Sequence, residues 1–385
     1  MYQNKNMAGL YLHIPFCKKR CIYCDFYSTT LGAAWRKRYV AALCQELTKR
    51  KSYLKGEELE TIYLGGGTPS QLDEDNLTTL FQAIATTYNL ERCNEITIEA
   101  NPDDLTPSYI ELLQNYPINR ISIGIQTFHD KMLTRLNRRH TSQQAIEAVE
   151  NCTKAGFTNL SIDLMYGLPG ETLADWEKDI QQAIALHPNH ISAYHLIYEE
   201  GTALWQLKEQ HQVSEVEEDL SLAFFSTLIQ QLTAAGYEQY EISNFSLPGY
   251  ASKHNSSYWE GTPYLGCGPS AHSFDGLYRS HNPKDIVAYT HAIEKGLSLL
   301  EVEETTLYTR YNDYIITSLR TSKGLSLTYL KDKFGETLYR YCCEQAQPHL
   351  QQEMLLQRGH SFFISKKGLF ISDGIMSDLL FVEEE

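Results

Sequence analysis

The sequence predicts an α/β protein in which parallel strands alternate with helices, followed by a smaller, mostly helical domain. The first observation behind this prediction is that short β-branched runs alternate with helical patterns from residue 10 to about 245. Strand, helix and strand in repeated order indicate parallel strands joined by right-handed crossovers. The second observation is that the chain becomes mainly helical from about residue 283. Six repeated units are compatible with a doubly wound sheet or a barrel.

Six runs rich in β-branched residues are predicted to be strands. The carboxyl ends of parallel strands lie at one edge of a sheet or barrel, so we expect functional residues just after these runs. The runs are LYLHI (10–14), TIYLG (61–65), EITIEA (95–100), RISIGI (120–125), LSIDLMY (160–166) and ISAYHL (191–196).

Helix boundaries can be predicted between these strands. Thr141 and Thr172 each begin the pattern of an N-terminal capping box, and Gly156 is a C-terminal stop signal for the first of these helices. Pro107 has the position of a first-turn proline. Ser214 is predicted to open a further helix. These signals place helices in the intervals between strands.

The end of the chain has a different character. Residues 246–282 are rich in Gly, Pro, Ser, Asn and aromatic residues, which predicts a loop, and the length of the stretch indicates a function. Beyond it, GLSLTYLKDKFG (324–335) has a helix-turn-helix pattern, and residues 360–372 are predicted to form a hairpin that turns at Lys367-Gly368. We expect a small winged-helix-like domain here. The predicted divisions of the chain are 1–245, 246–282 and 283–385.

Composition excludes some classes of function. The chain of 385 residues has 33 Lys+Arg against 48 Asp+Glu, a net charge of −15, which disfavours a nucleic-acid backbone as partner. No run has the length of a membrane span. We therefore expect a cytoplasmic protein, whose nine cysteines stay reduced and form no disulfide framework.

Three cysteines, Cys17, Cys21 and Cys24, lie within eight residues just after the first predicted strand. A structural zinc site uses four ligands, usually in two pairs, and a redox CxxC motif needs two cysteines. Three thiolates fit a [4Fe–4S] cluster that keeps one iron open for a ligand from outside the protein. Surface thiols or a partial zinc knuckle remain the alternatives.

Polar residues and glycines follow the next strands. Gly65-Gly66-Gly67-Thr68-Pro69 comes after the second strand, where glycines allow a ligand to approach the backbone closely. Glu99, Gln126 and Asp163 lie at the ends of the third, fourth and fifth strands, and Arg138 follows shortly after the fourth. Each alone is more often a strand-end cap. Together they predict one polar pocket for an amino-acid-like or nucleoside-like ligand.

The motifs resemble those of a known family. CxxxCxxC after a first strand, with GGGTP after the second, is similar to radical S-adenosylmethionine (SAM) proteins. More narrowly, HIPFCKKRCIYCDFYS, GGGTPS, SIGIQTF and IDLMYGLPGET resemble the oxygen-independent coproporphyrinogen III dehydrogenase family, over nearly the whole chain. The resemblance implies a partial (β/α)6 barrel of radical SAM type with an iron–sulfur cluster at its top.

The resemblance also implies a set of cofactor contacts. Cys17, Cys21 and Cys24 would hold a [4Fe–4S] cluster, and the amino and carboxylate groups of SAM would chelate the open iron. One-electron reduction of such a cluster cleaves SAM to a 5′-deoxyadenosyl radical. The positions that match SAM contacts in the family are Tyr11, Tyr23, Gly66, Gly67, Thr68, Glu99, Gln126, Arg138 and Asp163.

Within the family, the sequence resembles the HemW branch best. Phe26 stands where the dehydrogenases have a further cysteine, and only sixteen residues precede Cys17, where they have a longer extension. HNSSYW (254–259) resembles the HNxxYW signature of the HemW branch. This branch implies a heme chaperone that delivers heme to apo-hemoproteins, including membrane-bound respiratory subunits. A cytoplasmic protein in peripheral contact with the membrane, and a homodimer, are the corresponding expectations.

The HNSSYW stretch also supplies candidate heme contacts. His254 and Tyr258 are the candidate ligands, and Trp259 is a candidate wall for the macrocycle. Cys267 and His272 are weaker candidates. The alternative for His254 is a hydrogen bond within the loop. Two functions remain open: a heme chaperone with a radical SAM core, and a coproporphyrinogen III dehydrogenase that decarboxylates two propionates.

Overall fold

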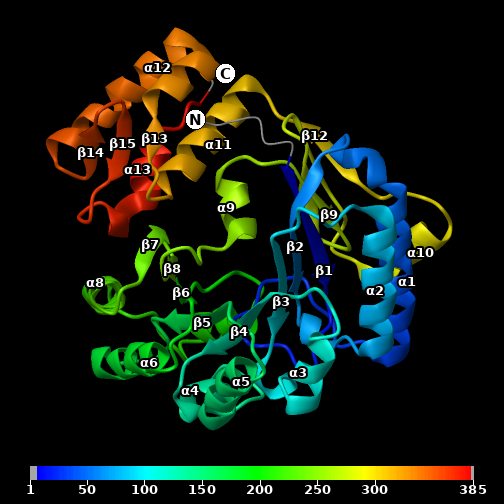
Figure 1. Cartoon of the computed structure of the whole chain (residues 1–385). Coiled ribbons are helices and arrows are strands. Elements are labelled where there is room, and N and C mark those ends of the chain that lie inside the picture. The colour runs from blue at the N-terminus through cyan, green and yellow to red at the C-terminus, as the bar shows by residue number, and fades with distance from the viewer. Residues whose placement is uncertain (1–6, 383–385) are drawn as a thin grey trace.

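The computed structural model describes residues 7–382. Helices line the outside of a curved sheet, and the C-terminal region lies beside the strands at the upper left of Figure 1. The strands are β1 (Met7–Ile14), β2 (Glu58–Gly66), β3 (Glu95–Ala100), β4 (Arg120–Gln126), β5 (Leu160–Tyr166), β6 (His190–His195), β7 (Glu238–Glu241), β8 (Asn244–Ser246), β9 (Tyr264–Cys267), β10 (His272–Phe274), β11 (Tyr278–His281), β12 (Glu301–Glu304), β13 (Leu325–Ser326), β14 (Leu355–Arg358) and β15 (Ser361–Ile364).

Each parallel strand is followed by helical chain that leads back to the next one. The α-helices are α1 (Ala33–Lys49), α2 (Glu74–Thr87), α3 (Pro107–Leu113), α4 (Asp130–Arg135), α5 (Ser142–Lys154), α6 (Leu173–Ala185), α7 (Ala203–Glu209), α8 (Glu218–Ala234), α9 (Lys253–Trp259), α10 (Ile286–Glu294), α11 (Leu307–Leu319), α12 (Leu327–Gln351) and α13 (Ser372–Asp378). Short 3₁₀ turns lie at Lys51–Leu54, Pro69–Gln71, Pro102–Asp104 and Leu369–Ile371.

The main sheet is an open, parallel-dominated sheet. Among the described residues it contains twelve strands, in the order β12-β11-β10-β9-β1-β2-β3-β4-β5-β6-β8-β7. Strands β1 to β6 pair in parallel in chain order. The outer edge of β1 pairs with β9, and the outer edge of β6 pairs with β8. The six parallel strands therefore form a partial barrel, as the resemblance implied.

Most of the predicted elements are confirmed. All six strands are present, Thr141 and Thr172 begin capping boxes, and Pro107 is the first residue of α3. Gly156 has a φ of 93° directly after the end of α5. The prediction at Ser214 was wrong, because α8 begins at Glu218 and the Ser214 carbonyl instead accepts a hydrogen bond from the Tyr198 hydroxyl.

Two predictions for the later part of the chain were wrong. Residues 246–282 are not a plain loop, because they contain α9 and the short strands β9 to β11. Glycine turns between short strands give this stretch its loop-like composition. The predicted hairpin does not turn at Lys367-Gly368. Its strands β14 and β15 turn at Gly359-His360, where Gly359 has a φ of 58°.

The C-terminal region packs around its own core. Buried side chains from α11, α12, β15 and α13 form a hydrophobic cluster separate from that of the main sheet. By contrast, α10 packs against α1, and β12 lies at the edge of the main sheet with four exposed residues. The division of the chain into 1–245, 246–282 and 283–385 stays a prediction. No helix within residues 7–382 is both long and apolar enough to cross a bilayer.

A buried carboxylate connects the N-terminal helix to the segment after β9. Glu46, on α1, accepts hydrogen bonds from Arg50, the Gly268 backbone N–H, Asn282 and Tyr289. Its side chain is 3% exposed. Because an ion in a dry interior is stable only when it is paired and hydrogen-bonded, this network fixes the position of β9 beside β1.

We expect Glu46→Gln to lower the free energy of unfolding by about 3 kcal/mol, because the buried Arg50 loses its charged partner. The midpoint of denaturant unfolding, followed by circular dichroism, measures the change. The matched control is Glu294→Gln, which removes an exposed ion pair with Arg38 and should have a small effect. Equal midpoints for the two variants would contradict the importance of this network.

Candidate functional site

The loop after β1 holds the three clustered cysteines in place. It is closed at its base by backbone hydrogen bonds from Cys17 N–H to the Thr29 carbonyl (2.8 Å) and from Thr29 N–H to the Pro15 carbonyl (2.6 Å). Farther along, the Ile22 N–H donates to the Leu136 carbonyl, in the segment after β4. The loop is therefore tied to the carboxyl ends of both β1 and β4.

The three thiols lie within electrostatic reach of one another. Burial, together with nearby Cys21 and Cys17, raises the pKa of the Cys24 thiol to about 11. The hydroxyl of Thr68 donates a hydrogen bond to the Cys17 sulfur (3.4 Å), and the Arg138 guanidinium donates one to the Cys21 sulfur (3.4 Å). Donors of this kind favour thiolates over thiols.

The glycines after β2 bring the backbone close to β1. A Cβ on Gly66, which has a φ of 112°, would lie 2.6 Å from the His13 ring, and a Cβ on Gly67 would lie 2.7 Å from the carbonyl carbon of Pro15. These positions therefore need glycine for packing as well as for ligand access. The Gly66 N–H points to the Glu99 carboxylate (3.1 Å).

Two carboxylates lie on β3 and β5, with Glu99 next to the last residue of β3 and Asp163 in the middle of β5. Glu99 accepts hydrogen bonds from the Tyr63 hydroxyl (2.7 Å) and from Gly66, yet burial raises the pKa of its carboxyl to about 7. Burial also raises the pKa of Asp163, which accepts a hydrogen bond from Ser122 (3.3 Å). The fully buried Arg120 opposes both shifts with its positive charge.

Arg138 joins the cysteine loop to this polar rim. Its Nη2 donates to the Asn101 side chain (2.6 Å) and to the Gly124 carbonyl. Its Nε is buried and has no hydrogen-bond partner within residues 7–382. Nearby, Gln126 has a φ of 74° at a break in the β4–β5 register. A buried guanidinium with a spare donor fits an anionic or carboxylate-bearing ligand.

These residues surround one cavity of about 470 Å³. The three cysteines line it, and so do eight of the nine predicted SAM contacts: Tyr23, Gly66, Gly67, Thr68, Glu99, Gln126, Arg138 and Asp163. Tyr11 does not line it. The Tyr11 hydroxyl is hydrogen-bonded to His13 Nδ1 (3.0 Å), and its ring faces a second cavity.

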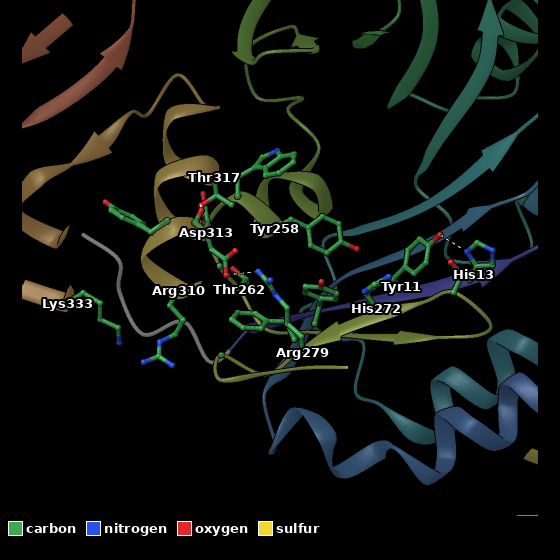
Figure 2. Close-up of a pocket in the computed structure, with 18 of the residues that line it drawn as sticks. Tyr11, His13, Tyr258, Thr262, His272, Arg279, Arg310, Asp313, Thr317 and Lys333 are labelled. Atoms are coloured by element: carbon green, nitrogen blue, oxygen red, sulfur yellow. Dashed lines mark hydrogen bonds and ion pairs between the residues drawn. The ribbon is translucent and has the colours of Figure 1, made fainter. Parts of the chain in front are cut away.

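The second cavity, of about 820 Å³, lies between β1, α9, β9 to β11 and the C-terminal region (Figure 2). Tyr258 and Trp259 of the HNSSYW stretch line it. His254 lines neither cavity. Its ring is buried, with Nδ1 hydrogen-bonded to Thr61 (2.8 Å) and Nε2 to the Tyr258 hydroxyl (2.8 Å). His254 therefore makes hydrogen bonds within the protein, which the sequence analysis gave as the alternative to heme ligation.

The weaker heme candidates differ in position. Cys267 is fully buried in β9 and lines neither cavity, and burial raises the pKa of its thiol well above the ordinary value. His272 is exposed at the start of β10 and lines the larger cavity. The structure therefore brings Tyr258 and His272 to the same cavity and leaves the other two candidates outside it.

Sequence reasoning missed several polar residues of the smaller cavity because it considered only the positions after each strand. Several of them lie inside the strands and line the same cavity as the predicted residues. Alternation in RISIGIQ places Arg120, Ser122, Gly124 and Gln126 on one face, and a period of two could have identified them. Further examples inside strands are Tyr63, Ser192 and Tyr194, and Asn101 directly follows β3.

Comparison with known proteins agrees with this geometry. The radical SAM superfamily model matches residues 11–183. A protein of Lactococcus lactis subsp. lactis, named heme chaperone HemW, is 33% identical over 99% of this chain and 98% of its own length. The chain belongs to the HemW family of radical SAM proteins.

Two further similarities concern the HemW family and its fold. HemW of Bacillus subtilis is 34% identical over 86% of this chain and 88% of its own length. Among solved structures, coproporphyrinogen III oxidase (HemN) of Escherichia coli superimposes with a TM-score of 0.83, covering 97% of this chain and 90% of that one. At 22% identity, the likeness to HemN establishes the fold alone.

Membership of the superfamily implies a [4Fe–4S] cluster and SAM, and the smaller cavity fits both. Three thiols and the Nε of Arg138, which has no hydrogen-bond partner within residues 7–382, are groups that such cofactors need. The bound pair supplies one-electron chemistry. Cys17, Cys21 and Cys24 would hold the cluster, while the glycine turn, Glu99, Asp163 and Arg138 would orient SAM.

We expect Arg138→Gln to weaken SAM binding at least about tenfold, because a charge-assisted hydrogen bond to the ligand is lost. Equilibrium binding to anaerobically reconstituted protein measures the change, with iron content determined in parallel. Arg135→Gln is the control, since Arg135 donates to the Pro169 carbonyl (2.9 Å) outside the cavity. Unchanged affinity at normal iron content would remove Arg138 from the SAM site.

The raised pKa of Glu99 predicts a pH dependence of stability. Folded Glu99 keeps its proton up to about pH 7, whereas the unfolded carboxyl loses it near 4.5, so its contribution to stability declines as pH rises between these values. Glu99→Gln mimics the protonated form. We expect this variant to gain stability relative to the wild type as pH rises, by up to about 3 kcal/mol. Denaturant unfolding of both proteins at several pH values measures the difference. A difference in the free energy of unfolding that stays constant across this range would contradict the raised pKa of Glu99.

Proposed function

We propose that this protein is a heme chaperone that binds heme and transfers it to apo-hemoproteins, with a [4Fe–4S] cluster and SAM in its core. Relatives at 31–39% identity are named heme chaperone HemW. The observation that carries the proposal is the larger cavity, which combines aromatic walls, a basic end and contact with the cysteine loop. Its features match those of a tetrapyrrole carrying two propionates.

The walls of the larger cavity favour a flat apolar ligand. Aromatic side chains reach it from the main sheet, from α9 and from the C-terminal region, and aromatic faces pack well against a macrocycle. Its volume lies within the range of roughly 300–1,000 Å³ that is typical of cofactor sites. The aromatic residues that line it are Tyr11, Phe26, Tyr27, Tyr258, Trp259, Tyr264, Phe274, Tyr314, Tyr329 and Phe334.

Although acidic residues outnumber basic ones in the chain, several basic side chains line this cavity. Arg310 and Lys333 lie at the end formed by α11 and α12 (Figure 2). Arg279 is neutralised by Asp313 at 2.5 Å, whereas Lys284 and Lys333 have no ion pair among the described residues. Unpaired lysines and an arginine beside a cavity lined by aromatic rings favour a ligand with carboxylates at one edge.

The cavities share part of their walls. Asp25 and Phe26, directly after Cys24, line both. Helix α9 also contributes to both, since Asn255 lines the smaller cavity while Tyr258 and Trp259 line the larger one. A tetrapyrrole in the larger cavity would therefore lie beside the SAM site, which keeps a coproporphyrinogen III dehydrogenase as the second candidate.

For the recipient, we propose apo-hemoproteins that include membrane-bound respiratory subunits. This assignment follows the HemW-type function, and it would place a cytoplasmic protein in peripheral contact with a membrane during delivery. The homodimer also stays a prediction.

The decisive experiment offers two substrates to the anaerobically reconstituted protein. With heme, we expect a stable Soret band, followed by transfer of the heme to an apo-hemoprotein such as apomyoglobin. With coproporphyrinogen III, SAM and a reductant, we expect no protoporphyrinogen. Protoporphyrinogen formation without heme transfer would overturn the chaperone assignment in favour of the dehydrogenase.

A matched pair of variants separates the two cavities in the same assay. Phe274→Ala removes part of the aromatic wall of the larger cavity and should weaken heme binding with little effect on the cluster. Cys17→Ser should remove the cluster. Heme affinity that is identical in wild type and Phe274→Ala would place the heme elsewhere.

A further inference from the structure

Histidine is the commonest protein ligand of heme iron, and three histidines lie in or beside the larger cavity. Two of them have both ring nitrogens occupied. His13 bonds Tyr11 through Nδ1 (3.0 Å) and the Tyr27 carbonyl through Nε2 (2.9 Å). His254 bonds Thr61 and Tyr258. Binding iron through either residue would break a buried hydrogen bond and leave its partner unsatisfied.

His272 is the third histidine, and it differs from the other two. It is exposed at the start of β10, lines the cavity, and has no side-chain hydrogen bond among the described residues. Its ring stacks on His281 of the neighbouring strand, with centroids 5.1 Å apart and planes 20° apart. This stacking holds the ring while leaving its nitrogens available.

His272 and the basic residues Arg310 and Lys333 lie toward different sides of the larger cavity. Figure 2 shows His272 next to Tyr11 at one side of the cavity, while Arg310 and Lys333 lie toward the other side. Tyr258 lies between them. If the edge carboxylates of a heme disc reach Arg310 and Lys333, His272 binds the metal at its centre only when a face of the disc, and not its opposite edge, is turned toward β10.

We propose that His272 is the axial ligand of the heme iron in this cavity, and that Arg310 and Lys333 bind the heme propionates. This inference depends on the proposed function, because it presumes that the protein binds heme. It assigns iron ligation to the segment after β9 and leaves His254 of the HNSSYW stretch as a positioning residue, which holds Tyr258 at the wall.

The test uses full-length protein titrated with ferric heme and followed by absorption and EPR spectroscopy. We expect His272→Ala to lose the histidine-ligated spectrum and to bind heme at least roughly tenfold more weakly. Added imidazole should restore the spectrum, which a merely structural role would not allow. His291→Ala is the matched control, because His291 is an exposed histidine of α10 that does not line the cavity. It should keep the wild-type ligation.

The outcomes distinguish the two proposals. If wild-type protein binds no heme, both the function and this inference fail. If the wild type binds heme and His272→Ala retains its ligation spectrum, only the inference fails. Loss of that spectrum in His254→Gln, with His272→Ala unaffected and both variants folded by circular dichroism, would return the ligand role to His254.

The propionate contacts have their own measurement. We expect wild-type protein to bind heme roughly tenfold or more tightly than heme dimethyl ester, because the ester lacks carboxylates. The double variant Arg310→Gln/Lys333→Gln should lose this preference. Lys331→Gln, on the same helix but outside the cavity, is the control. Equal preference in the wild type and the double variant would remove these two residues from the site.

Discussion

Parallel pairing on both edges of β1 is the constraint from which the rest of the structure follows. On one edge, β2 brings the glycine turn to the cysteine loop, and the strands beyond β2 add the carboxylates Glu99 and Asp163. The smaller cavity forms there. On the other edge, β9 begins the antiparallel strands that line the larger cavity. Because the cysteine loop leaves the carboxyl end of β1, it lies between the two cavities and contributes to both.

Charge compensation explains why so polar a rim can be buried. Glu99 and Asp163 lie close enough to Arg120 for its positive charge to oppose the rise in their pKa values, and Arg138 adds a second positive charge beside the sulfurs. Neither guanidinium is fully satisfied within the described residues. The arrangement is therefore stable but incomplete, as expected of a site that gains its remaining hydrogen bonds from a ligand.

Much of this site could be predicted from sequence, because cysteine spacing and strand-end residues are local patterns. Eight of the nine predicted SAM contacts line one cavity. Tyr11 lines the larger cavity instead, because alternation along a strand sends neighbouring side chains to opposite faces, and a motif position does not reveal which face is lined by ligand. The availability of His272, and the engagement of His254 by Thr61, depend on contacts between distant segments, which no local pattern contains.

The pairing of β9 with β1 also has a consequence for synthesis. Gly9 is paired with Tyr264, so the first strand leaves the ribosome long before its second neighbour exists. Until then, one edge of β1 stays open, and an unpaired edge can associate with other chains. The larger cavity is thus among the last parts of the nascent polypeptide to form. A truncated product would carry the cysteine loop without this cavity.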